Sequence, residues 1–248
     1  MDNSRLVSFL EKRGIYVLNE EFIAPKEEDD ILNQIDNIIA FQKCIGEYKE
    51  NLYPRIGSVI GKEINSFNSQ LRLMSSYYKK VEKREELNTI DFYFIRRAEA
   101  LIDKGRKALD HLYACNYKKL IEESMKNYEV CLTRVDEKNL YVSEDGKILV
   151  KTIRYLSYNL KEHDIYSYIK KLKRRDKDIN CEEIISYYVE KLKLDKANKE
   201  YLRALSSYPC EELRILEKYI LGKLKERDDK IINSLEKARK YDSNGIIM

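Results

Sequence analysis

The chain has 248 residues, of which 47 are basic and 43 acidic, giving a formal net charge of +4. Charged residues make up 36% of the chain and hydrophobic residues 43%, against about 25% charged for an average globular domain. Because charges of both signs alternate with apolar residues, the composition indicates long amphipathic helices rather than disorder. The low content of eight Gly and three Pro disfavours a turn-rich sandwich or barrel.

The composition also indicates a reducing, aqueous setting without metal. His111 and His163 have no Cys or His at ligand spacing, so we expect no zinc site. The first 14 residues are charged from the start and no apolar stretch reaches 18 residues, which argues against a signal peptide and a membrane span. We expect a cytoplasmic protein without a membrane partner, whose cysteines are small core residues. The five cysteines, with no C-x-x-C pair, are Cys44, Cys115, Cys131, Cys181 and Cys210.

Hydrophobic residues repeat at helical spacing through the first half of the chain. Gly14 is placed to end the first helix, and Asn88 or Thr89 to begin the fourth. A short extended piece is expected from Ile15 to Ala24, before Pro25, and a turn at Tyr53-Pro54. The predicted helices cover residues 4–13, 31–49, 57–84, 88 to about 112, and 116–126.

The one convincing β signal is a hairpin at about residues 140–153. Two runs rich in β-branched and aromatic residues, starting at Leu140 and Ile148, flank an Asp145-Gly146 turn, a pairing typical of tight hairpins. Helical spacing then resumes, and we find no internal repeat or low-complexity linker. The later helices are predicted at about 162–174, 181–193, 196–207, 211–222 and 224–241.

Around this hairpin the sequence resembles a known family. The stretch VCLTRVDEKNLYVSEDGKILVKTIRYLSYNLKEHDIYSYIKKL (residues 130–172) is similar to the catalytic segment of the kinase-like fold of aminoglycoside and choline phosphotransferases. More narrowly, it resembles the CotS-type spore-coat kinase-like proteins of endospore-forming bacteria. Two further stretches, residues 77–112 and 204–223, resemble the helices before and after that segment, so the resemblance covers about residues 30–245.

The residues that would carry phosphoryl transfer are replaced. In the family's H-G-D-x-x-x-x-N pattern, Leu132 stands at the His and Arg134 at the catalytic Asp, while Asn139 matches the second metal-binding residue. In the I-D-F-D pattern after the hairpin, Thr152 stands at the magnesium-binding Asp and Arg154 at the second Asp. Phosphoryl transfer needs carboxylates to orient the nucleophile and to hold magnesium. An arginine at such a position repels Mg²⁺, so the resemblance implies a degenerate site without a metal.

The resemblance also implies a structural residue and a reduced nucleotide-binding half. Asp164 matches the family's Asp that braces the catalytic loop, although an acid in the first turn of a helix also stabilises the helix dipole. Residues 1–30 contain neither a glycine-rich loop nor a strand with a phosphate-binding lysine. We therefore expect a vestigial N-terminal segment (residues 1–30) and a mainly α, kinase-like C-terminal lobe of about eight helices with one hairpin (residues 31–248).

Three functions follow as hypotheses. The first is a catalytically inactive kinase-like scaffold of the spore coat or of sporulation, in the mother-cell cytoplasm or the coat, which binds protein partners but no cofactor, ATP or Mg²⁺. The second is a divergent small-molecule phosphotransferase that uses Asp136 as its base, although Asp136 and Glu137 are better explained as solvated or locally paired charges.

The third hypothesis is a helical adaptor for an anionic partner. Its candidate residues are Arg134 and Arg154, which would turn the old cleft into a basic pocket, and a basic run on the helix after the hairpin. Such a run is usually the solvated end of a helix. It contains no aromatic residue for stacking, which argues against nucleic acid. The run consists of Lys170, Lys171, Lys173, Arg174, Arg175 and Lys177.

Overall fold

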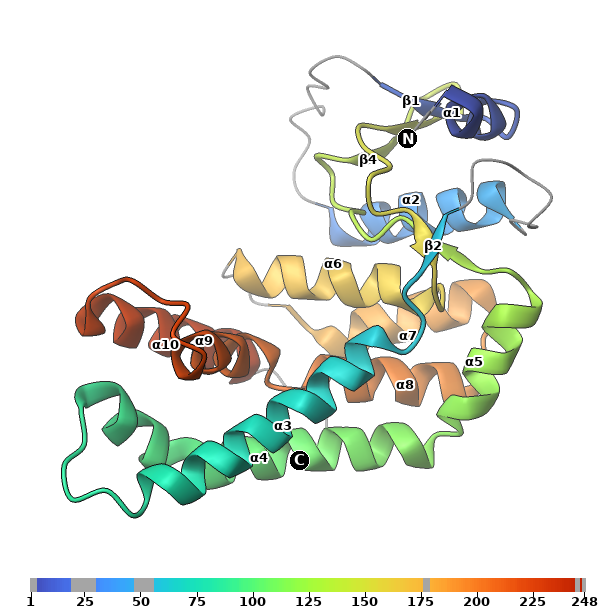
Figure 1. Ribbon diagram of the computed structural model, residues 1–248. Coiled ribbons are helices and arrows are strands. Elements are labelled where there is room, and N and C mark those ends of the chain that lie inside the picture. The colour runs from blue at the N-terminus through green and yellow to red at the C-terminus, as the bar shows by residue number, and fades with distance from the viewer. Residues whose placement is uncertain (1–3, 19–29, 47–55, 176–178, 244–245, 247–248) are drawn as a thin grey trace.

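The structure is a computed structural model that describes residues 4–18, 30–46, 56–175, 179–243 and 246. Within these residues the chain forms ten α-helices and six short strands, which confirms the mainly α fold (Figure 1). The helices are α1 (Ser4–Glu11), α2 (Ile31–Ile45), α3 (Lys62–Val81), α4 (Thr89–Ala114), α5 (Tyr117–Lys126), α6 (Glu162–Arg174), α7 (Cys181–Leu192), α8 (Lys196–Ser207), α9 (Cys210–Ile220) and α10 (Asp228–Ser243). The strands are β1 (Ile15–Val17), β2 (Gly57–Ser58), β3 (Val130–Cys131), β4 (Leu140–Val142), β5 (Ile148–Val150) and β6 (Ser157–Tyr158).

The predicted hairpin is present and gains a third strand. β4 and β5 pair antiparallel, with Leu140 opposite Val150, and Gly146 adopts the left-handed φ of +78° that the turn requires. β1 adds to β5 in parallel, with Ile15 opposite Ile148, so that the sheet order is β1-β5-β4. The N-terminal residues 4–17 thus pack on the hairpin, and Leu10 and Ile15 are completely buried.

A second small sheet corrects the predicted start of the third helix. Gly57–Ser58 pairs in parallel with β6, which also pairs antiparallel with β3. The helix therefore begins at Lys62 and not at Gly57, after Gly61 has turned the chain with a φ of +76°. The last helix likewise begins at Asp228 and not at residue 224. The expected turns at Pro25 and at Tyr53-Pro54 lie outside the described residues.

The long helix α4 forms one side of the helical body, with α3 and α8 packed against it (Figure 1). Its N-cap is Asn88, whose side-chain oxygen accepts a hydrogen bond from the Asp91 N–H at 2.8 Å, as the sequence predicted. No helix among the described residues has the length and apolar character that crossing a bilayer requires.

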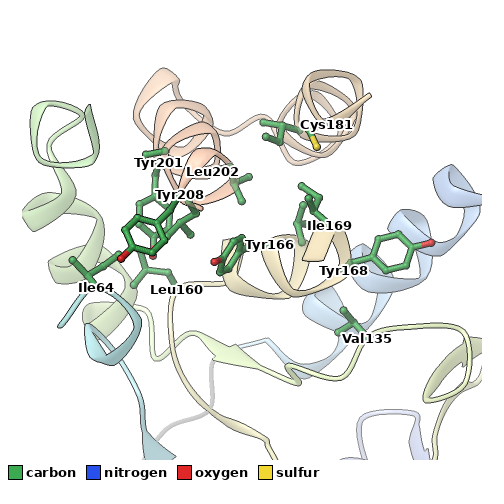
Figure 2. Close-up of a cluster of buried hydrophobic side chains, with 14 of the residues drawn as sticks. Ile64, Val135, Leu160, Tyr166, Tyr168, Ile169, Cys181, Tyr201, Leu202 and Tyr208 are labelled. Atoms are coloured by element: carbon green, nitrogen blue, oxygen red, sulfur yellow. The ribbon is translucent and has the colours of Figure 1, made fainter. Parts of the chain in front are cut away.

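Tyrosines form much of the core between α6, α8 and the long helices (Figure 2). Tyr166, Tyr168 and Tyr201 are almost completely buried. Tyr208 stacks on Phe67 with 3.7 Å between ring centroids, and its hydroxyl donates to the Phe67 carbonyl at 3.1 Å. Tyr166 and Tyr208 bring large apolar rings to the place where α6 and α8 meet the long helices. Tyr168 points from the other side of α6 (Figure 2), where its hydroxyl donates to Glu137 at 2.8 Å.

Candidate functional site

The loop that matches the family's catalytic pattern connects β3 to β4. Its second residue, Thr133, has a φ of +67°, a left-handed conformation that is costly for a β-branched side chain. Thr133 stands where the pattern H-G-D has glycine, the residue that adopts this conformation without strain. Thr133 therefore holds a backbone conformation that glycine adopts more readily.

Asp164, in the first turn of α6, supports this conformation. Its carboxylate accepts hydrogen bonds from the backbone N–H groups of Thr133 at 2.8 Å and Leu132 at 3.4 Å. A third donor is the side-chain amide of Gln42 on α2, at 3.3 Å. Asp164 is fully buried, and this burial raises the pKa of its carboxyl to about 6, although the hydrogen bonds oppose the shift. The side chain thus links the loop to two helices.

Asn139 closes the loop onto the end of the hairpin. Its side-chain NH₂ donates to the carbonyls of Arg134 at 2.5 Å and Thr152 at 3.2 Å, and its side-chain oxygen accepts from the Thr152 N–H at 2.8 Å. The residue is buried. The Asn139 side chain, at the position that matches the family's second metal-binding residue, thus forms its hydrogen bonds with backbone atoms of the chain itself.

Arg134 and Arg154 both lie against one tyrosine, Tyr155. The guanidinium carbon of Arg134 is 4.6 Å from the centroid of the Tyr155 ring, and that of Arg154 is 5.7 Å from it. All three side chains are exposed, and among the described residues neither arginine forms an ion pair. We call Arg134, Arg154 and Tyr155 the loop cluster. Leu132, at the position of the family's His, is completely buried in the core.

These residues do not fit a magnesium site. The position that would supply the first metal-binding carboxylate is Thr152, and the adjacent charges are the guanidiniums of the loop cluster. Hard divalent cations require several oxygen ligands, usually including carboxylates. Within the described part of the chain, no group of three or more His, Cys, Asp or Glu side chains is arranged to hold a metal ion.

Two acids within the β3–β4 loop, Asp136 and Glu137, face the basic run on α6. Arg175 pairs with Glu137 at 2.8 Å and with Asp136 at 3.5 Å, and Lys171 pairs with Asp136 at 3.4 Å. The local ion-pair interpretation of Asp136 and Glu137 is therefore confirmed. Neither carboxylate is left as a free base.

The rest of the basic run is paired as well. Lys170 contacts Glu63 at 3.0 Å, and Arg174 donates to Glu211 at 2.8 Å. Lys173 is buried and donates to the Ser206 carbonyl at 2.8 Å. The described cations of the run are thus paired within the chain, although the side chains of Lys171 and Arg174 remain 44% and 46% exposed. Lys177 lies outside the described residues.

One buried acid, Glu162, was not among the residues that the sequence singled out. Glu162 on α6 is 1% exposed and accepts a hydrogen bond from the side-chain amide of Asn198 at 2.7 Å. Burial and the nearby charge of Glu129 raise the pKa of Glu162 to about 7, against the opposing charge of Lys161. An acid in the first turn of a helix is typical of a solvated dipole contact, so the sequence carried no signal for this burial.

A structural comparison relates this geometry to a known fold. Neither a protein-family model nor a curated protein sequence matches the chain. Among solved structures, an aminoglycoside phosphotransferase from Alicyclobacillus acidocaldarius subsp. acidocaldarius is similar, with a TM-score of 0.67. The match covers 92% of this chain and 68% of that chain, at 11% sequence identity. The chain has a phosphotransferase-like, kinase-like fold. This confirms the fold that the resemblance implied, whereas the CotS-type relationship and the loss of activity stay predictions.

Replacing Asp164 tests its role in the loop. We expect Asp164→Ala to lower the free energy of unfolding by about 2 kcal/mol, because two buried N–H groups and the Gln42 amide lose their acceptor. For a domain of this size, the midpoint of thermal unfolding should fall by about 4–8 °C. Asp103→Ala, at an exposed acid on α4, is the control and should change the midpoint little. Equal midpoints for Asp164→Ala and wild type would contradict the bracing role.

The buried carboxyls should also make stability depend on pH. The carboxylate of Asp242 on α10 accepts hydrogen bonds from the backbone N–H groups of Glu211 at 3.1 Å and Glu212 at 2.8 Å. Burial raises the pKa of Asp242 to about 7, the same value as that of Glu162. Unfolded carboxyls have a pKa near 4, so the folded state binds more protons around pH 7. The two carboxyls together should therefore lower the free energy of unfolding by about 1.5 kcal/mol between pH 6.5 and pH 8. His163, whose pKa burial lowers to about 4, opposes this, because the unfolded imidazole loses its remaining proton in the same range. The net fall should be about 1 kcal/mol.

Denaturant unfolding between pH 6.5 and pH 8 measures this slope. Glu162→Gln removes one titrating carboxyl and should lower the slope by more than half, whereas Glu144→Gln in the exposed hairpin turn should leave it unchanged. A wild-type stability that rises with pH across this window would show that these carboxyls are ionised in the folded protein.

Proposed function

We propose that this chain is a catalytically inactive kinase-like protein that acts as a scaffold, in the spore coat or during sporulation. The observation that carries the proposal is the loop cluster. Two exposed guanidiniums, Arg134 and Arg154, occupy positions where a phosphotransferase needs acids, and no described carboxylate pairs with either one. The spore setting is drawn from the sequence resemblance.

The chemistry of phosphoryl transfer argues against an enzyme. The reaction requires a carboxylate to orient the nucleophile and oxygen ligands to hold Mg²⁺ against the triphosphate. Asp136, the candidate substitute base, is held by Lys171 and Arg175. These two ion pairs engage both carboxylate oxygens of Asp136 within the chain. This favours the scaffold over the divergent phosphotransferase.

The loop cluster favours an anionic group on the partner. Arginines without an acidic partner among the described residues can attract a carboxylate or phosphate, and the Tyr155 ring lies against both of them. The cations of α6, by contrast, already have partners within the chain. If an anion binds at the old catalytic loop, Arg134 and Arg154 are the residues that hold it.

Thermal unfolding with ATP and Mg²⁺ tests the loss of activity. We expect no Mg²⁺-dependent change, whereas a ligand at 100 times its Kd would stabilise the fold by about 2.7 kcal/mol and raise the midpoint by several degrees. ATP with EDTA is the matched control. An EDTA-resistant shift that disappears in Arg134→Ala/Arg154→Ala would support anion binding by the loop cluster. A shift that requires Mg²⁺, or Mg²⁺-dependent ATP hydrolysis, would contradict the proposal.

A fluorescent fusion tests the cellular setting. In sporulating cells of an endospore-forming bacterium, we expect the fusion to gather around the developing spore, because a coat component binds other proteins at that surface. The charge-reversed variant Arg134→Glu/Arg154→Glu should gather less strongly if the loop cluster holds the partner. A signal spread evenly through sporulating cells would contradict the coat role.

A further inference from the structure

A groove runs between α3 and α4, away from the loop cluster. Its volume is about 520 Å³, and the two helices that form it lie at the opposite end of the molecule from β4 (Figure 1). They approach each other closely at Gly105, where an added Cβ would lie only 2.7 Å from the Leu71 side chain. Leu71 and Leu109 line the groove and are nearly buried, so its base is apolar.

Positive charge dominates the rim of this groove. Arg72 and Lys79 of α3 and Arg106 of α4 line it and are exposed. Asp110 is the one acid among the described residues that line it, so the local charge is +2 (three cations less one acid). Within the described chain none of the three cations forms an ion pair, although Arg106 donates to the Ser75 hydroxyl at 3.3 Å. The groove therefore differs from the paired run on α6.

We propose that this groove binds an acidic amphipathic helix of a protein partner. Arg72 and Lys79 lie on one face of α3, two turns and about 10 Å apart. A partner helix can place carboxylates at the same spacing, and its apolar side chains can contact the base formed by Leu71 and Leu109. This is the helix-in-groove mode of peptide recognition, with complementary charge at the rim.

The lining favours a peptide over a nucleic acid. Single-stranded nucleic acids are bound through aromatic side chains on which successive bases stack. Tyr113 is the one aromatic residue among the described residues of the lining, and its hydroxyl accepts a hydrogen bond from the Asn68 side-chain amide at 2.8 Å. One tethered ring offers no platform for consecutive bases.

A binding measurement with a synthetic peptide tests the proposal. The probe is a fluorescent helical peptide of about four turns with leucines along one face and glutamates on both flanks, titrated by anisotropy at low and physiological salt. We expect binding that weakens as salt rises and that falls about tenfold in Arg72→Glu/Lys79→Glu. The control Lys80→Glu/Lys83→Glu changes the net charge equally, at exposed positions outside the groove lining, and should bind nearly as wild type does.

Three results would overturn the proposal. The first is the absence of peptide binding to the wild-type chain at low salt. The second is an equal loss of affinity in the two double variants, which would show attraction to net charge rather than to the groove. The third is tighter binding of a single-stranded oligonucleotide of the same charge, lost in Arg72→Glu/Lys79→Glu, which would assign the groove to nucleic acid. Since all four mutated side chains are exposed, matching thermal midpoints should confirm that both variants fold.

Discussion

The geometry of the candidate site depends on one buried carboxylate. Asp164 accepts hydrogen bonds from two consecutive backbone N–H groups of the loop, at Leu132 and Thr133, and holds Thr133 at a positive φ. A β-branched residue does not adopt this conformation by preference, so the acceptor on α6 fixes what the local sequence disfavours. The contact of Asp164 with Gln42 extends the same constraint to α2.

The distribution of ion pairs is the second organising feature. The densest cluster of positive charge in the sequence, on α6, is engaged by acids from the β3–β4 loop, α3 and α9. Partly buried ion pairs of this kind help to fix the positions of the helices and the loop relative to one another, although each pair contributes little net stability. The cations that remain without acidic partners in the described chain include those of the loop cluster and the groove, which makes these surfaces the natural places for an anionic partner.

Local signals made much of the fold predictable. The hairpin followed from two β-rich runs around Asp145-Gly146, and the start of α4 from the capping residue Asn88. The parallel pairing of β1 with β5 and the two-residue strand β2 could not be predicted, because segments this short carry no periodicity and their partners lie far along the chain.

The sequence predicted which residues form the candidate site, but not which side chains surround them. The pattern located Arg134, Asn139 and Asp164, and these residues do converge on one loop. Tyr155 lies outside the pattern, so nothing in the sequence placed its ring against two arginines. The acids that engage the α6 cations also come from distant segments, such as Glu63 and Glu211. Tertiary packing therefore determines which charged side chains find a partner of opposite charge.

The hydrogen bonds that shape the loop do not depend on the side chains of Arg134 and Thr152. Asp164 and Asn139 bond to backbone atoms: the N–H groups of Leu132, Thr133 and Thr152, and the carbonyls of Arg134 and Thr152. Backbone atoms are present whatever the side chain, so an acid can be exchanged for arginine or threonine without breaking these bonds. This hydrogen-bond network therefore does not require any particular side chain at positions 134 and 154. Both side chains are exposed, so the packing of the fold does not account for their charge.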